Sequence, residues 1–377
     1  MRRCLLQHEE HVPWKPAFPV IDAHNHLWGK WSNADQILRV MDQAGVVAYC
    51  DLTANACVEW LGGGYRFGAT DINGFFREVC DRHPGRFYGF TMASFNVPAD
   101  QPLIQDYGAF VAECVATLED HVRRGARGLK LLKELGMRFR DATGRLVRTD
   151  DERLAPIWQA CARLKVPVLI HQSDPLGFFQ PLTPDNEHYE SLLKFPDWQF
   201  HDRSKFPDKQ ELLASRDRLL RSHPETTFIL PHVANYPEHL TYVAELLANH
   251  PNVFIDFSAR TDELGRQPYT AREFMIRHQE RILFGTDMPA SLEMYRYHYR
   301  FLETFDEHFV PPDYDGTFGR HRWCVHGLGL PREVLRKIYH QNALRLIPGL
   351  RAQAGPVIGR LLAETSDNTQ PQINPNL

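Results

Sequence analysis

The chain has 377 residues, and 43% of them are hydrophobic, so it can form one large globular domain or two ordinary ones. Its 43 basic and 47 acidic residues give a net charge of −4, with no basic excess that would attract nucleic acid or an anionic membrane. No stretch approaches the ~20 apolar residues of a membrane-spanning helix. We therefore expect neither a nucleic-acid partner nor a membrane partner.

The seven cysteines are scattered, odd in number and without a Cys-x-x-Cys pair. This usage is typical of buried thiols in a reducing compartment. The first residues also lack the apolar stretch of a secretion signal. Together these features predict a cytoplasmic protein.

Short apolar runs alternate with helix-length segments along most of the chain, which predicts a parallel sheet. The eight candidate strands lie at about 19–24, 46–52, 86–90, 126–132, 166–171, 227–232, 253–258 and 281–287. Eight such units fit a distorted (β/α)₈ TIM barrel. An open doubly wound sheet is the alternative, but it requires a glycine-rich first turn, and the first strand ends instead in His24-Asn25-His26.

The predicted barrel spans residues 18–350 and is flanked by an N-terminal arm at 1–17 and a C-terminal tail at 351–377. A long insertion at 172–207 follows the fifth strand, where it would cover a site at that end of the barrel like a lid. Residues 61–68 are rich in glycine and are predicted to be a mobile loop.

His24 and His26 follow the first apolar run with one residue between them. On an extended backbone residues i and i+2 point to the same side. Two imidazoles that project together suit one metal ion, because imidazole is the commonest metal ligand in proteins. The alternative is a pair of ordinary surface histidines.

Other strands end in polar side chains at the same end of the barrel, where catalysis occurs in this fold. These residues are Lys130, His171, His232 and Asp287. Each has a structural explanation by itself: a histidine in the core, an aspartate that caps a helix, or a lysine that snorkels to the rim. Together, imidazoles and one carboxylate are the ligand set of a catalytic Zn²⁺-type site.

The pattern resembles the amidohydrolase superfamily over roughly residues 19–347. The matching motifs are His24-Asn25-His26, His171, His232 and Gly285-Thr286-Asp287. The segment 339–346 resembles the final helix of the branch that contains aminocarboxymuconate-semialdehyde decarboxylase. The resemblance implies one divalent metal, Zn²⁺ with Mn²⁺ or Fe²⁺ as alternatives. It also implies ligands and an acid/base residue: His24, His26, His171 and Asp287 as ligands, with His232 free for proton transfer or for stabilising an anion.

Three further positions are candidate substrate contacts. Lys130 corresponds to a lysine that is carboxylated and bridges two metals in some members of the superfamily, and here a substrate contact beside a single metal is the favoured interpretation. Arg260 follows the seventh strand and suits a substrate carboxylate, or an ion pair with Asp262 or Glu263. Trp28 and the aromatic residues of the insertion either form a pocket wall or pack the insertion onto the barrel.

The first functional hypothesis is a metal-dependent hydrolase that uses a metal-activated water on an amide, ester or lactone of a small, carboxylate-bearing organic substrate. The alternative is a nonoxidative decarboxylase of an aromatic or unsaturated carboxylic acid. A metal-binding scaffold without catalytic activity is a third class. A small-molecule substrate and a homo-oligomer, most simply a dimer, are the expected partners.

Overall fold

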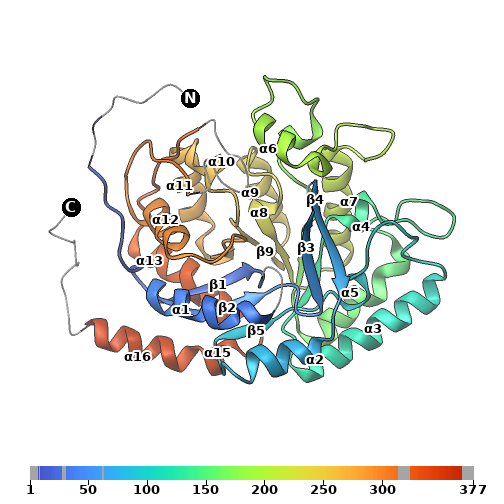
Figure 1. Ribbon diagram of the computed structural model, residues 1–377, viewed down its shortest axis with the longest axis horizontal. Helices are drawn as coiled ribbons and strands as arrows, with labels where there is room; N and C mark the ends of the chain where they lie inside the picture. Colours follow the sequence, from blue (N-terminus) through green and yellow to red (C-terminus); the bar gives the residue numbers. More distant parts are fainter. Residues whose placement is uncertain (1–6, 8, 28–30, 62, 313–322, 367–377) are drawn as a thin grey trace.

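The computed structural model describes residues 7, 9–27, 31–61, 63–312 and 323–366 (Figure 1). Eight parallel strands follow one another around a barrel, in the order of the chain. They are β1 (Val20–Asn25), β2 (Val46–Asp51), β5 (Phe87–Gly89), β6 (Leu129–Leu131), β7 (Val168–Ile170), β8 (Phe228–Leu230), β9 (Val253–Asp256) and β10 (Ile282–Leu283).

Two seams close the ring of strands. At one seam the Ala23 amide of β1 donates to the Phe284 carbonyl just after β10, at 2.9 Å. At the other, the Thr91 amide after β5 donates to the Gly128 carbonyl before β6, at 3.0 Å. The chain therefore forms the predicted distorted (β/α)₈ barrel. Its strands are very short, and each hydrogen bond that closes the ring involves a residue just outside a strand.

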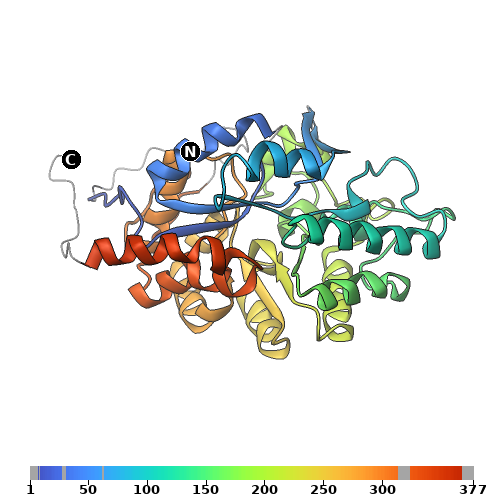
Figure 2. The ribbon, with the colours of Figure 1, turned by 90° about the horizontal axis from the view of Figure 1, so that it is seen from below.

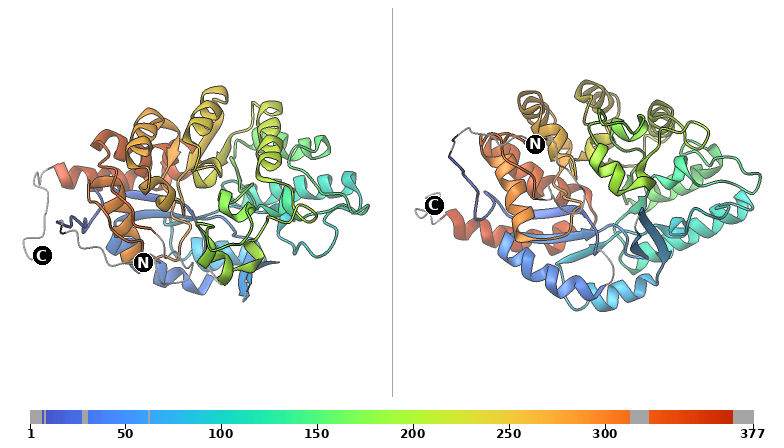
Figure 3. Two further views of the ribbon diagram at one scale, coloured as in Figure 1. Left: turned by 90° about the horizontal axis from the view of Figure 1, so that it is seen from above. Right: turned by 45° about the horizontal axis from the view of Figure 1, so that its top comes forward.

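The main helices surround the strands (Figure 3). They are α1 (Ala34–Ala44), α2 (Ile72–Phe75) continued by η2 (Phe76–Cys80), α3 (Tyr107–Arg124), α5 (Ala155–Leu164), α7 (Lys209–Ser222), α9 (Leu240–Asn249), α11 (Pro268–Arg277) and α12 (Leu292–Glu303). In α1 the buried residues recur at helical spacing, and Gly45 ends the helix with φ of 79°. Asp208 and Glu211 form a capping box at the start of α7.

Shorter helical turns lie between these elements. They are η1 (Trp31–Asn33), η3 (Ala93–Phe95), α4 (Glu134–Met137), η4 (Glu152–Leu154), α8 (Pro231–Ala234), α10 (Thr261–Gly265) and η7 (Gln279–Arg281). Within the described residues, no helix has both the length and the apolar character needed to cross a bilayer.

The glycine-rich segment is not the mobile loop that the sequence predicts. An antiparallel hairpin occupies this part of the chain, with β3 (Ala56–Leu61) paired to β4 (Gly64–Ala69). Tyr65 and Phe67 alternate along β4, and Phe67 pairs with Val58 across the hairpin. The glycines hide this short alternation of apolar residues, which is the usual signal of a strand.

The insertion at 172–207 forms a separate lobe over the barrel, beside the hairpin (Figure 1). It contains η5 (Leu176–Phe179), α6 (Tyr189–Lys194) and η6 (Pro196–Trp198). Phe178, Leu192 and Phe200 form a small core of their own with two residues of the barrel helices. The Asp197 amide donates to the Gly63 carbonyl at 2.9 Å, so the insertion and the hairpin touch. The predicted lid-like insertion after the fifth strand of the barrel is confirmed.

Helices cover the end of the barrel at which the strands begin (Figure 2). They are α13 (Arg332–Arg336), η8 (Lys337–Gln341), α14 (Asn342–Leu346), α15 (Leu350–Gln353) and α16 (Gly355–Ser366). Gly349 lies against Arg127, just before β6, and Gln353 lies next to Gly85, just before β5. Leu350 and Ile358 join one apolar cluster with strand residues.

The sequence predicts only a tail from residue 351, and this expectation is wrong for residues 351–366. The apolar residues of α16 recur three and four positions apart, a stripe too short to stand out beside Gly355 and Pro356. Residues 367–377 lie outside the described residues. The division into arm, barrel and tail otherwise stays a prediction.

Candidate metal centre

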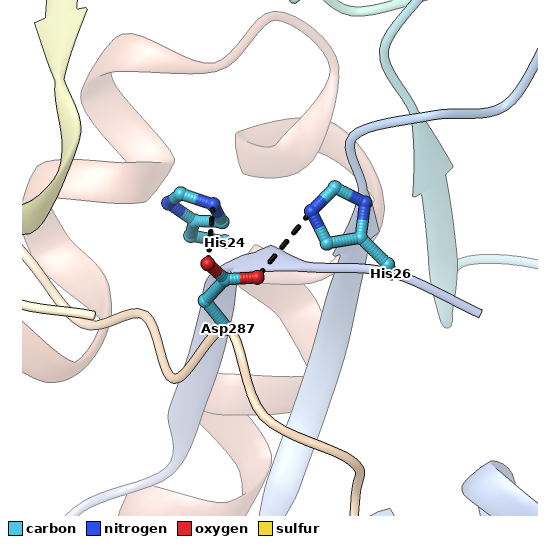
Figure 4. A group of neighbouring side chains, drawn as sticks. All are labelled: His24, His26 and Asp287. Atoms are coloured by element: carbon cyan, nitrogen blue, oxygen red, sulfur yellow. Dashed lines mark ion pairs between the residues drawn. The ribbon is translucent and has the colours of Figure 1, made fainter. Parts of the chain in front are cut away.

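Three of the predicted metal ligands lie together at the seam between β1 and β10 (Figure 4). His24 and His26 come from the end of β1, and Asp287 follows β10. The two Asp287 carboxylate oxygens lie 3.4 Å from His26 Nε2 and 3.7 Å from His24 Nε2. One ligand atom from each residue lies within 4.8 Å of the others. The first and last strands of the barrel thus bring together residues that are about 260 positions apart.

Both imidazoles are oriented from behind by hydrogen bonds. The His24 Nδ1 lies 2.8 Å from an Asp256 carboxylate oxygen, and the His26 Nδ1 lies 3.0 Å from the Thr53 hydroxyl. These contacts leave each Nε2 directed at Asp287. Carboxylate–histidine pairs of this kind fix the ligand nitrogen in metal sites. The Nδ1 atoms of both imidazoles are thus hydrogen-bonded, and their Nε2 atoms point at a carboxylate. Two imidazoles and a carboxylate in this arrangement fit a divalent metal.

The electrostatics keep the donor atoms in the forms that bind metal. Burial lowers the pKa of both His26 and His171 to about 4, so both rings are neutral at pH 7. Burial alone would raise the pKa of Asp287, but His24 and His26 overcome this effect and hold that pKa below its usual range. Neutral imidazoles beside an ionised carboxylate are ready to coordinate a cation without first losing protons.

His171 and His232 stand next to each other, with ring centroids 4.6 Å apart. His171 is outside the three-residue cluster, and its Nε2 lies 3.5 Å from an Asp174 carboxylate oxygen. His232 Nε2 lies 3.7 Å from Asp287. Among the described residues, neither Nε2 has a hydrogen-bond partner although both are buried. Buried polar atoms are normally bonded, so both rings present an unused nitrogen to the site.

The backbone is strained at three of these positions. His232, Ala259 and Asp287 adopt φ of 58°, 51° and 51°, in the left-handed region that residues with a side chain seldom enter. Each lies just beyond a strand at the carboxyl end of the barrel. Strain of this kind gathers at functional sites, where the surrounding structure holds it in place.

Lys130 lies inside the site rather than on its rim. It is only 1% exposed, and its amino group lies 3.5 Å from His24 Nε2. Burial lowers the pKa of Lys130 to about 8. The snorkelling interpretation is therefore wrong, whereas a substrate contact and a carboxylated bridging lysine both place the amino group where it lies.

A pocket of about 970 Å³, measured out to its open mouth, lies over the cluster. The hairpin supplies part of its wall, which the sequence does not predict. The insertion supplies Phe178 and Trp198, whereas Phe200 is completely buried in the core of the insertion. The aromatic residues are thus divided between the two predicted roles. Trp28 lies outside the described residues.

Two cations with different surroundings face the pocket. Arg260 lines it, is 7% exposed, and forms no ion pair within the described residues. Its Nη1 donates to the Ala259 carbonyl at 2.6 Å, and its buried Nε has no partner there. Lys133, which the sequence does not single out, pairs with Asp174 at 2.7 Å. Lys133 and Asp174 lie in the loops just after β6 and β7, at the carboxyl end of the barrel, and this position is the signal that could have found them.

The chain belongs to the amidohydrolase family, because the model of that family matches residues 21–349. This match confirms the resemblance seen in the motifs and makes the protein an enzyme of that family. A comparison with curated protein sequences finds no match.

Several solved structures are similar to this chain. A 4-oxalomesaconate hydratase from Rhodopseudomonas palustris is 16% identical, with a TM-score of 0.50, over 91% of this chain and 99% of that one. An uncharacterised TIM-barrel protein from Bordetella bronchiseptica is 18% identical, with a TM-score of 0.49, over 89% and 99%. A 2,6-dihydroxybenzoate decarboxylase from Rhizobium is 17% identical, with a TM-score of 0.48, over 87% and 98%.

Proposed function

We propose that this protein is a metal-dependent hydrolase that cleaves an amide, ester or lactone of a small, carboxylate-bearing substrate. The observation that carries this proposal is the convergence of His24 Nε2, His26 Nε2 and the Asp287 carboxylate beneath a pocket. The complete His-x-His pair favours water activation, because it adds a second neutral ligand beside the carboxylate.

His24, His26, His171 and Asp287 would hold one divalent metal, Zn²⁺ in the first place and Mn²⁺ or Fe²⁺ as alternatives. When bound, such an ion lowers the pKa of water toward 7 and polarises a substrate oxygen. His171 would turn its unused Nε2 from Asp174 toward the other ligands.

The side chains of the pocket divide the remaining work. Asp287 accepts the proton of the attacking water. His232 Nδ1 lies 2.8 Å from the Ser258 carbonyl, to which it must donate, so the lone pair of the neutral ring is on Nε2. His232 therefore accepts a proton from Asp287 and passes it to the leaving group. Arg260 and Lys130 would bind the substrate carboxylate.

A nonoxidative decarboxylase of an aromatic or unsaturated acid is the second candidate. The observation that favours it is the pocket itself, because Tyr65, Phe67, Phe178 and Trp198 line it near Arg260. Flat aromatic walls suit a flat ring. The Arg260 guanidinium, whose buried Nε has no partner in the described part of the chain, suits a carboxylate.

A substrate screen with matched variants distinguishes the two candidates. Metal-reconstituted protein is assayed with a panel of lactones and amides for acid release, and with hydroxybenzoates for release of carbon dioxide. His26→Ala serves as the site variant, and His201→Ala, a change at an exposed histidine of the insertion, as its control. Hydrolysis that is lost only in His26→Ala, with metal near one equivalent per chain, supports the hydrolase.

Release of carbon dioxide with the same dependence on His26 would favour the decarboxylase instead. Full metal content and activity in His26→Ala would contradict both. A metal content near two that falls on changing Lys130 to alanine would identify Lys130 as a bridging ligand. Light scattering tests the expected homodimer separately.

A further inference from the structure

The segment that carries His232 is a left-handed turn. Four consecutive residues, from His232 to Asn235, have φ between 53° and 58°, and none of them is glycine. A left-handed conformation is unfavourable for a residue with a side chain, because the Cβ atom approaches the following carbonyl oxygen. The turn therefore persists only because the surroundings hold it, and those surroundings decide where the His232 ring points.

Two buried cations on α7 hold the end of this turn. The Lys209 amino group donates to the Asn235 carbonyl at 2.6 Å, and the Arg216 guanidinium donates to the Ala234 carbonyl at 2.5 Å. Lys209 is 2% exposed and Arg216 is completely buried. Both carbonyls belong to the left-handed turn, where no neighbouring helix or strand among the described residues offers them a main-chain donor. The two side chains of α7 donate to them instead.

Lys209 also reaches the base of the insertion. Its amino group donates to the Asp174 carbonyl as well as to that of Asn235. The Asn235 side chain completes this link, because its oxygen accepts the Gln172 amide at 3.1 Å. The Asp174 side chain faces the pocket, where it meets Lys133 and His171. One ammonium group thus joins the turn of His232 to the first residues of the lid.

Packing alone does not explain a lysine at this position. Burying an ammonium group is expensive unless it is fully hydrogen-bonded, and a methionine would fill the same space without that penalty. The Lys209 amino group lies 4.9 Å from the centre of the Tyr236 ring and 5.8 Å from that of Phe179, so these rings surround it without neutralising it. What the lysine adds is the pair of main-chain contacts.

We propose that Lys209 is a positioning residue, which holds the His232 ring and the Asp174 edge of the pocket in fixed register through the carbonyls of Asn235 and Asp174. The catalytic consequence rests on the proposed function, because it requires that His232 act in the reaction. The positioning itself is a property of the fold and is measured without a substrate.

Nuclear magnetic resonance of protein labelled with ¹⁵N-histidine tests the positioning directly. His232→Asn assigns the His232 signal by its loss. In Lys209→Met we expect the imidazole signal of His232 to shift or broaden, while the signal of the distant His83 stays unchanged. Arg281→Met is the matched control, because Arg281 also donates to two main-chain carbonyls, those of Val253 and His250. It should leave the His232 signal unmoved.

An unchanged His232 signal in a folded Lys209→Met protein overturns the proposal, whatever its activity. If Lys209→Met does not fold, Lys209→Gln is examined in the same way, because its side chain stays polar but is one bond shorter and cannot reach the carbonyls of both Asn235 and Asp174. A shift in that variant supports the proposal and an unmoved signal overturns it.

A kinetic test applies once a substrate is known. We expect Lys209→Met to lower kcat by up to ~10²-fold, the effect of a displacement of about 1 Å, with a smaller change in KM. The double variant Lys209→Met/His232→Asn should lose less than the product of the two single losses, because part of the effect of Lys209 passes through His232. Losses that multiply would show a merely structural role and overturn the proposal. Positioning without any activity would count against the proposed function only.

Discussion

The two ends of the barrel are built from opposite kinds of side chain. Where the strands finish, the buried His24 and His232 lie beside the partly buried Asp287 on a backbone that is partly left-handed. Where the strands begin, Leu350 and Ile358 close the barrel with apolar contacts. Buried polar atoms without hydrogen-bond partners destabilise the end at which the strands finish. Burial of apolar surface at the end where they begin offsets this loss. One end of the barrel therefore serves the chemistry and the other serves stability. Substitutions at the two ends should have correspondingly different effects.

Asp287→Asn should have the largest effect on activity. It removes both the carboxylate that the metal would bind and the base that accepts the proton of water. We expect activity to fall by ~10⁴-fold, the upper end of the range for loss of one general base, and the metal content to fall with it. Steady-state kinetics beside elemental analysis measure both. A variant that keeps its metal and its activity would contradict the role of Asp287 and the assignment of the chemistry to this end of the barrel.

His232→Asn should lose activity by ~10²–10⁴-fold, mostly in kcat, and should keep its metal. Asparagine preserves approximate size and hydrogen bonding but cannot carry a proton near pH 7. Kinetics and metal content are measured on the same preparation. Loss of metal along with activity would make His232 a ligand, and full activity would remove it from the mechanism.

Leu350→Ala should act on stability alone. Leu350 is completely buried between α15 and the strands, and truncation of a buried leucine costs ~2–5 kcal/mol in the free energy of unfolding. Urea denaturation measures this loss. The metal content and kcat of the folded variant should equal those of the wild type, and a large fall in kcat would show that the two ends are coupled.

The pH dependence of the free energy of unfolding gives the contribution of one imidazole, that of His26, at the polar end of the barrel. Burial holds the pKa of His26 at about 4 in the folded protein, against ~6.5 in an unfolded chain. Between these values only the unfolded chain is protonated, so the wild type loses stability as the pH falls from 6.5 to 4. Relative to His26→Gln the loss should be about 3 kcal/mol. Urea denaturation of both metal-free proteins measures it, and a constant difference would contradict it.

The strands and the candidate metal ligands are predictable from sequence because their signals are local. Each barrel strand is a short apolar run, and His24 and His26 announce themselves by spacing alone. The contacts of Lys209 are not predictable in this way, because its partners lie 26 and 35 positions away. Nothing in the local pattern around Lys209, which begins an ordinary amphipathic helix, distinguishes a buried lysine from an exposed one.

The two missed elements failed for a different reason. The hairpin and α16 each carry a valid periodic pattern, but glycine or proline interrupts or precedes it. Those residues are strong signals for turns, and here they mark a hairpin tip and a helix start. In both segments the turn signal of glycine or proline is stronger than the short periodic pattern beside it.

The seam between β1 and β10 has a consequence for how the protein is made. A ribosome releases His24 and His26 early and Asp287 about 260 residues later, so the three donors cannot meet until nearly the whole chain has emerged. Synthesis at ≈ 5–20 residues per second separates the two events by roughly 13–50 s. During that interval the histidine pair is an incomplete chelator. A metal that binds at this seam would therefore be loaded at the last stage of synthesis, and it would link the first strand to the last.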